Sequence, residues 1–170
     1  MPGTRLHCYG YFHTTAWRKK EGDVNAYLII GEPGTRKSSL LRSLTGCFNR
    51  SDRDIELLDD TTIRIYARVS TLQESKTNAR DFLAEVAKRD CPNVIFSLLP
   101  DPNPLFPIPY PDAQTYIDTF LEAGWHFVRT AVVGIHSISP AIPHVAHFPR
   151  TASQPINIVA RNIRAHFEWY

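Results

Sequence analysis

Residues 27–45, YLIIGEPGTRKSSLLRSLT, decide how the rest of the chain is interpreted. The stretch begins with four apolar residues, a pattern that favours a central β-strand covered on both faces. A turn with two glycines follows, and then a basic pair and two serines. From Ser38 onward the apolar residues recur at the spacing of one helix face, and Gly46 is a typical helix stop. The stretch therefore predicts a strand, a tight loop and a helix in direct succession.

The loop resembles the Walker A motif of P-loop nucleotide-binding proteins, G-x-x-x-x-G-K-[ST]. Gly31 matches the first glycine, Lys37 the lysine and Ser38 the hydroxyl residue. The resemblance implies that backbone N–H groups and the positive end of the helix dipole bind the phosphates of ATP or GTP. The nucleotide-binding residues that it implies are Gly31, Glu32, Pro33, Gly34, Thr35, Arg36, Lys37, Ser38 and Ser39.

Arg36 departs from this motif, because it stands where the last glycine belongs. That glycine usually supplies a backbone conformation that a side chain disfavours, at a cost of about 1–3 kcal/mol. Three alternatives follow. The guanidinium points outwards, or it adds a charge near the phosphates, or the loop has relaxed and no longer binds phosphate.

The resemblance also implies a magnesium ion bound with the nucleotide. By this resemblance Lys37 reaches the outer phosphates and Ser38 helps to hold Mg²⁺. Residues 55–60, IELLDD, resemble the Walker B pattern, which makes Asp59 the second magnesium candidate and Asp60 its alternative. The competing interpretation of these acids is a turn that leads into the next strand.

Gln73 and Glu74 are the candidates for positioning an attacking water, and with Lys37 they form the predicted catalytic set. They follow an alternating strand at residues 62–69, and many P-loop enzymes orient water with a residue from the loop at this place. The competing interpretation is a polar loop that caps the next helix.

The remaining pattern predicts an α/β fold, a three-layer P-loop NTPase-like domain with a mainly parallel sheet that spans residues 1–170. The alternation at residues 62–69 predicts a half-exposed strand near a sheet edge. Residues 93–99 and 125–133 predict core strands, and residues 6–12 are a weaker strand candidate. Further helices are expected after the capping residues Asn78 and Asp112 and from Ser153 and Pro155.

Residues 100–111, PDPNPLFPIPYP, hold six of the 13 prolines and are excluded from helix and central strand. Because they follow a buried strand, they are interpreted either as a flap over the nucleotide or as a docking segment. The exposed docking residues would be Leu105, Phe106, Ile108 and Tyr110. In the competing interpretation these side chains pack on the domain.

Composition limits the possible partners. The net charge of +2 gives little attraction to nucleic acid or an anionic membrane, so nucleic acid is a less favoured partner despite the basic residues Arg18, Lys19 and Lys20. Three widely spaced cysteines favour a reducing compartment, and there is no apolar run of about 20 residues to span a membrane. His144 and His147 do not complete a metal-ligand set. We therefore expect a cytoplasmic protein without membrane contact.

Two functions remain in competition. The first is a small, Mg-dependent nucleotide-binding protein that serves as a slow NTPase or as a nucleotide-dependent switch. It would act on a protein partner or assemble as a homo-oligomer. The second is a pseudo-NTPase that serves as an interaction or structural subunit without hydrolysis. Neither the D-x-x-G nor the N-K-x-D pattern of GTPases occurs, so the motif leaves ATP and GTP both open.

Overall fold

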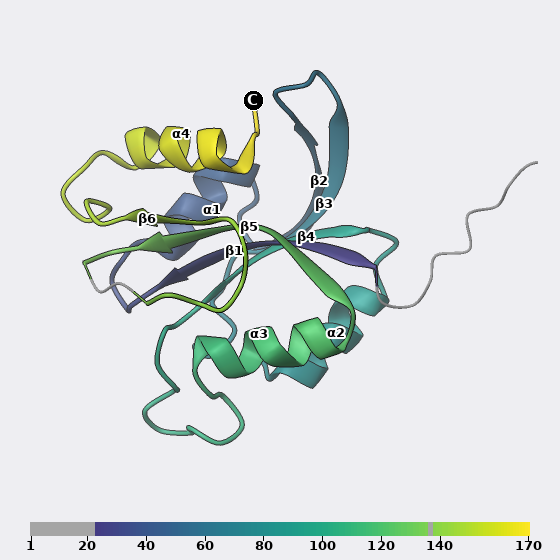
Figure 1. The fold of residues 1–170 in the computed structure, drawn as a ribbon, viewed down its shortest axis with the longest axis vertical. Coiled ribbons are helices and arrows are strands. Elements are labelled where there is room, and N and C mark those ends of the chain that lie inside the picture. Colours follow the sequence, from purple (N-terminus) through teal and green to yellow (C-terminus); the bar gives the residue numbers. More distant parts are fainter. Residues whose placement is uncertain (1–22, 136–137) are drawn as a thin grey trace, which may run out of the picture.

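The computed structural model describes residues 23–135 and 138–170; the predicted strand at residues 6–12 and the basic residues Arg18, Lys19 and Lys20 lie outside these ranges. Within them, six strands form one sheet in the order β2-β3-β4-β1-β5-β6 (Figure 1). The strands are β1 (Val24–Gly31), β2 (Arg50–Glu56), β3 (Thr62–Arg68), β4 (Asn93–Leu98), β5 (Trp125–Val133) and β6 (Val145–Phe148). All neighbours are parallel except β2 and β3, so the predicted α/β class with a mainly parallel sheet is confirmed.

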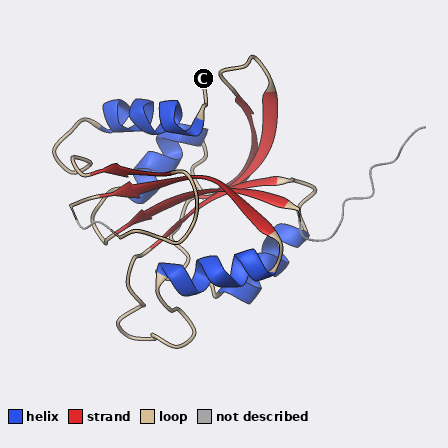
Figure 2. Cartoon of the chain, viewed as in Figure 1, coloured by secondary structure: helices blue, strands red, loops and turns tan. Residues whose placement is uncertain are grey.

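Helices cover both faces of the sheet (Figure 2). They are α1 (Lys37–Thr45), α2 (Ala79–Ala87), α3 (Ala113–Glu122) and α4 (Ile156–Phe167). α1 and α4 lie on one face, and α2 and α3 lie on the other (Figure 1). None of these helices is long and apolar enough to cross a membrane.

Strand β1 is buried on both faces, as its uninterrupted apolar run predicts. Leu28 and Ile30 belong to the apolar cluster that also contains Phe82 and Phe120 from α2 and α3. Ile29, the residue between them, belongs to the cluster that contains the apolar side chains of α1 and α4. Alternate residues of one strand therefore connect the two cores, as the pleat of a strand requires.

Strand β3 departs from the predicted half-exposed strand. Its place, second from the edge, agrees with the prediction, but Tyr66 and Arg68 are buried although the alternation predicts that they face solvent. Both side chains lie against α2, where Tyr66 Oη donates to Glu85 Oε1 at 2.5 Å and Arg68 Nη1 lies 3.4 Å from the same oxygen. A carboxylate on α2 thus satisfies two polar groups of the buried strand face.

Two predicted helix starts are confirmed by side-chain caps. Asn78 Oδ1 accepts from Asp81 N at 2.9 Å, and Asp112 Oδ1 accepts from Thr115 N at 2.8 Å. At the last helix, Pro155 is the N-cap residue and α4 begins at Ile156. These caps fix where the chain enters α2 and α3 after leaving the sheet.

The topology has a switch point at the carboxyl ends of the parallel strands. β1 continues into α1 on one face of the sheet, whereas its neighbour β4 continues into α3 on the other face. Open α/β sheets bind ligands at such a point, where adjacent strands send the chain in opposite directions. The loop after β1 and the loop after β3 both lie at this end of the sheet.

Arg164 connects α4 to the end of α1. Its Nη2 donates to Ser43 O at 3.1 Å and to Leu44 O at 3.0 Å, and its Nη1 donates to Tyr170 O at 3.1 Å. The last carbonyl groups of a helix lack partners within the helix, and a cation satisfies them well. Arg164 is therefore part of the packing between the two helices and not a free surface charge.

We expect Arg164→Ala to lower the free energy of unfolding by about 1.5–3 kcal/mol, the range for hydrogen bonds that involve a charged group. Arg161→Ala is the matched control, because Arg161 is exposed on the same helix. Urea unfolding followed by circular dichroism measures both variants. Equal stability of the two variants would contradict the role assigned to Arg164.

Candidate functional site

The loop between β1 and α1 is closed around one carbonyl oxygen. Glu32 O accepts from Thr35 N at 3.3 Å, from Thr35 Oγ1 at 2.7 Å and from Lys37 Nζ at 2.7 Å. The loop therefore fixes much of its own shape. It also packs on the end of β5, where a Cβ atom on Gly31 would lie 2.6 Å from Val133 Cγ2 and 2.9 Å from Val133 O. Only glycine fits at the first position of the motif.

Arg36 adopts the left-handed backbone conformation, with φ 64° and ψ 25°. The loop thus keeps the type of backbone turn that favours glycine, although an arginine makes it. The side chain is exposed, and its Nη1 donates to Gln154 O at 3.1 Å in the turn before α4. The loop therefore keeps its tight turn, and the guanidinium of Arg36 is directed to the turn before α4 while the residue also lines the cleft described below.

Lys37 is the first residue of α1, and its side chain is only 4% exposed. Burial lowers the pKa of its amine below the ordinary value, while the carboxylates of Glu74 and Glu32 act in the opposite direction. Arg36, the N-cap residue, makes no side-chain hydrogen bond to the first N–H groups of the helix. The helix start therefore combines a buried amine with N–H groups that have no intrahelical partner.

These groups face a cleft of about 230 Å³ between the loop after β1 and the loop after β3. Its lining residues are Gly34, Arg36, Lys37, Ser38, Ser39, Thr71 and Glu74. The structure thus brings Glu74 together with Lys37 and Ser38, as the sequence analysis predicts. Thr71 was not predicted as a site residue, although it lies in the same polar stretch after β3 that made Glu74 a candidate.

Asp59 lies elsewhere. It occupies the turn between β2 and β3, where its Oδ1 accepts from Thr61 N at 3.0 Å and from Thr61 Oγ1 at 2.6 Å. These bonds lower the pKa of its carboxyl. Because β3 runs parallel to β4 and β1, a residue before β3 lies at the end of the sheet opposite the cleft (Figure 1). The structure therefore does not bring Asp59, or its neighbour Asp60, to Ser38.

Gln73 is fully buried, and its amide does not line the cleft. Its Oε1 accepts from Leu99 N at 3.0 Å, while its Nε2 donates to Leu99 O at 3.0 Å and to Pro111 O at 3.2 Å. Gln73 and Glu74, the two candidates for positioning water, therefore lie in different surroundings. Glu74 lies in the cleft, and Gln73 holds the backbone on either side of the proline-rich segment.

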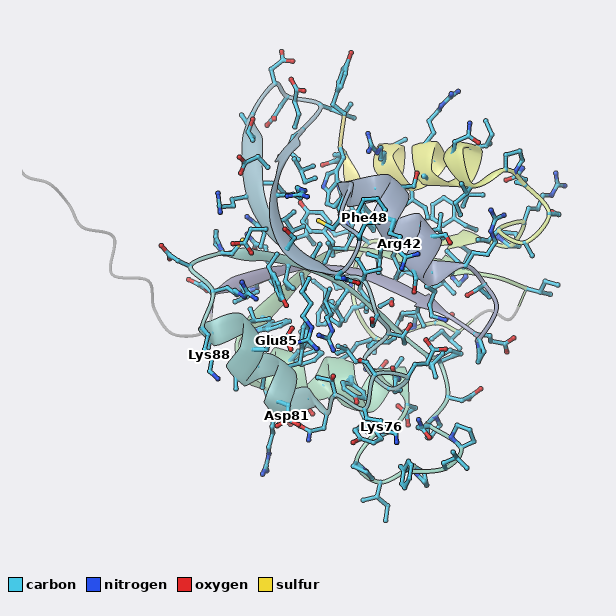
Figure 3. All side chains as sticks on the ribbon, turned by 180° about the vertical axis from the view of Figure 1, so that it is seen from behind. Arg42, Phe48, Lys76, Asp81, Glu85 and Lys88 are labelled. Atoms are coloured by element: carbon cyan, nitrogen blue, oxygen red, sulfur yellow. The ribbon has the colours of Figure 1, made fainter. Side chains whose placement is uncertain are left out.

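The proline-rich segment, residues 100–110, forms an ordered loop between β4 and α3. Asn103 N donates to Tyr110 O at 2.9 Å, and Asn103 Oδ1 accepts from Leu105 N at 2.9 Å. Lys76 Nζ lies 5.1 Å from the centroid of the Phe106 ring, and Figure 3 shows Lys76 beside this loop. Leu105 and Ile108 are exposed, at 78% and 91%. The exposed apolar tip agrees with the docking interpretation, whereas the segment does not line the cleft as a flap would.

No family model, curated protein or solved structure matches the chain. The chemistry of the cleft is therefore inferred from its own groups. Its lining residues carry one carboxylate, several hydroxyl groups, a buried amine and the guanidinium of Arg36, beside the start of a helix. No cluster of three or more histidine, cysteine, aspartate or glutamate side chains suited to a metal ion occurs in residues 23–135 and 138–170.

Hydroxyl and carboxylate oxygens are the ligands that Mg²⁺ takes when it binds together with substrate phosphates and water. Ser38 has a hydroxyl group and Glu74 a carboxylate, and the two residues line the cleft from different loops. The donor set therefore fits a phosphate-bound magnesium ion better than a metal held by protein alone. The second magnesium ligand predicted from the sequence was Asp59, and the cleft offers Glu74 in its place.

The left-handed conformation of Arg36 leads to a stability test. An alanine at this position retains the backbone strain, whereas a glycine relieves it, and both lose the bond to Gln154. We expect Arg36→Gly to be more stable than Arg36→Ala by about 1 kcal/mol, at the lower end of the cost of this conformation for an L-residue. Thermal or urea unfolding measures the difference. Two variants of equal stability would mean that the loop is not held in this conformation.

Proposed function

We propose that this chain binds the phosphates of ATP or GTP, together with Mg²⁺, in the cleft between the loops that follow β1 and β3. The left-handed Arg36 carries the proposal, because it leaves the loop with the turn that the phosphate-binding motif needs despite the missing glycine. The same turn places the buried amine of Lys37 at the start of α1, where the first N–H groups of the helix have no intrahelical partner.

The groups at the start of α1 suit an anion. Helix N-terminal N–H groups and the helix dipole favour negative charge, and phosphate is a common ligand there. Lys37 Nζ donates to Glu32 O within the loop, and a phosphate oxygen that replaces this carbonyl would receive a stronger, charge-assisted bond. We propose Lys37 as the phosphate ligand and the backbone from Gly31 to Ser39 as the cradle.

Ser38 and Glu74 are the residues that would hold magnesium. When bound, Mg²⁺ neutralises charge on the outer phosphates. Glu74 also remains the candidate for accepting a hydrogen bond from an attacking water, since its carboxylate belongs to the cleft. Gln73 has no such role in our proposal, because both ends of its amide bind backbone groups.

We propose slow turnover or switching, with a protein partner, in place of rapid catalysis. The cleft has a single carboxylate, and the exposed apolar tip of the proline-rich segment is a surface of the kind that partners use. A chain that binds nucleotide tightly and hydrolyses it slowly can couple its bound state to such a surface.

A second candidate function is a pseudo-NTPase that acts as an interaction subunit. One observation favours it: both loop cations already bind carbonyl groups of the protein, Arg36 at Gln154 and Lys37 at Glu32. In that case the loop is a structural junction, and the apolar Leu105 and Ile108 carry the function.

Titration calorimetry with ATP, GTP, their diphosphates and inorganic tripolyphosphate, with and without Mg²⁺, separates the two functions. For the nucleotide-binding function we expect micromolar affinity for at least one nucleotide. Lys37→Ala should weaken it by about 10–100-fold, the equivalent of one charged hydrogen bond. Lys88→Ala is the control that removes the same charge elsewhere. Lys88 is the C-cap residue of α2 and does not line the cleft (Figure 3).

If the folded wild-type protein gives no heat with any of these ligands, the nucleotide-binding proposal is wrong and the interaction-subunit function remains. If Lys37→Ala and Lys88→Ala weaken binding equally, phosphate binding depends on overall charge and not on the loop.

The lowered pKa of Lys37 predicts a pH dependence. Burial lowers this pKa below the ordinary 10.5, so the amine loses its proton at a lower pH than an exposed lysine does. Phosphate binds the protonated amine, so affinity should fall as the pH rises through the Lys37 pKa. Lys37→Arg keeps its charge throughout and should bind with little change over the same range. A fall of equal size in both proteins would assign the effect to another group.

A further inference from the structure

The side-chain amide of Gln73 pairs with the backbone just beyond the end of β4, as a neighbouring strand would. β4 ends at Leu98, and Gln73 exchanges two hydrogen bonds with the backbone N–H and C=O of the next residue, Leu99. Two neighbouring strands pair through the same donor and acceptor groups. The side chain therefore extends the ladder beyond the end of β4 and joins the loop after β3 to the loop after β4.

The same side chain closes the base of the proline-rich segment. Leu99 and Pro111 stand immediately before and after residues 100–110, and Gln73 Nε2 donates to the carbonyl of each. A further bond fixes the backbone of Gln73, because Asn103 Nδ2 donates to Gln73 O at 3.1 Å. Gln73 is thus held by both ends of the segment and by a residue within it.

Glu74 is the next residue, and its side chain is exposed in the cleft. The described contacts that fix this part of the chain are made by its neighbours. Leu72 N donates to Ser97 O at 3.2 Å, and Thr71 Oγ1 lies 3.2 Å from Ser97 Oγ. Both of these bonds, like those of Gln73, lead to β4 and the residues after it. On the other side of Glu74, Ser75 N donates to Thr71 O at 2.9 Å, and Ser75 Oγ accepts from Arg68 Nη2 of β3 at 3.1 Å. The backbone around Glu74 is therefore fixed by contacts to β3, to β4 and to the residues after β4.

We infer that Gln73 is a positioning residue that holds Glu74 in the cleft by fastening its loop to the proline-rich segment. The inference rests on the proposed function, in which Glu74 serves the magnesium ion. It makes the proline-rich segment part of the site, although the segment does not line the cleft. The loop between β1 and α1 is held by other contacts, since it closes on Glu32 O and packs against the end of β5.

Because the loop after β1 and the loop after β3 are fixed by separate contacts, a change at Gln73 should affect one measurable affinity and not the other. Metal-free binding of tripolyphosphate depends on the loop after β1. The gain in ATP affinity on adding Mg²⁺ depends also on Glu74 and hence on Gln73. A residue that merely stabilised the fold would lower both affinities or neither.

The test variant is Gln73→Glu, which keeps the size of the side chain but replaces the Nε2 donor with an oxygen that faces the carbonyls of Leu99 and Pro111. Gln114→Glu is the matched control: Gln114 also fastens a loop, since its Oε1 accepts from Ala141 N at 3.0 Å, but it does not line the cleft. Glu74→Gln removes the carboxylate itself. Titration calorimetry measures tripolyphosphate without Mg²⁺ and ATP with and without it.

We expect Gln73→Glu and Glu74→Gln each to reduce the magnesium-dependent gain about tenfold, with metal-free affinity within about twofold of wild type and Gln114→Glu unchanged. The double variant should be no worse than either single variant, because both changes remove one interaction. The inference is overturned if adding Mg²⁺ raises the ATP affinity of Gln73→Glu as much as that of the wild type. The same result for Glu74→Gln also overturns it. If the wild type binds neither tripolyphosphate nor ATP with Mg²⁺, the proposed function itself is overturned.

Asn103→Ala gives a second route if Gln73→Glu does not fold. It removes the bond to Gln73 O but leaves the buried amide in place, so we expect a smaller loss of the magnesium gain in the same direction. Amide hydrogen exchange adds a readout without nucleotide. Residues 71–77 should exchange faster in this variant, whereas residues 31–39 should keep the wild-type rate. Faster exchange in both loops would overturn the separate support of the two sides of the cleft.

Discussion

The left-handed turn at Arg36 is the constraint on which the cleft depends. It lets the chain leave β1 and enter α1 within six residues, so that the helix begins at Lys37 with its N-terminus at the carboxyl end of the sheet. For an L-residue this conformation costs about 1–2 kcal/mol. Contacts on both sides of the turn offset the cost: Arg36 binds Gln154 O, and Lys37 binds Glu32 O. The strain is retained where the start of α1 and the buried amine of Lys37 meet the cleft, and strained backbone of this kind is common at functional sites.

The sheet order explains why a second loop reaches this turn. β4 lies between β1 and β3, and all three strands point the same way. The loop after β3 therefore ends near the loop after β1, and its backbone is fixed on the end of β4 that lies between them. Thr71 and Leu72 bind Ser97, and Gln73 binds Leu99. The strand between the two loops sets the width of the cleft.

The sequence predicted the elements with strong local signals. Residues 27–30 and 93–99 are apolar without interruption, and Asn78 and Asp112 are caps whose partners lie three residues away. The edge strands β2 and β6 lacked such signals: β2 reads RSDRDIE, and β6 has only four residues. Without β2 the hairpin was not recognised, so the acids at residues 59 and 60 resembled the end of a parallel strand. An apolar run followed by acids describes both situations equally well.

The place of Gln73 was beyond local patterns for a different reason. Its partners Leu99 and Pro111 are 26 and 38 residues away, and an amide that pairs with backbone has no sequence signature. The composition of the intervening segment nevertheless bears on its role. Five prolines in residues 100–110 restrict the unfolded chain, so ordering the segment costs less entropy than ordering a flexible loop of equal length. A stiff segment closed at its base resists displacement of the residue that closes it. The prolines therefore favour a stiff segment that holds the loop carrying Glu74. They give less support to the flap over the nucleotide, which was expected from the position of the segment after a strand.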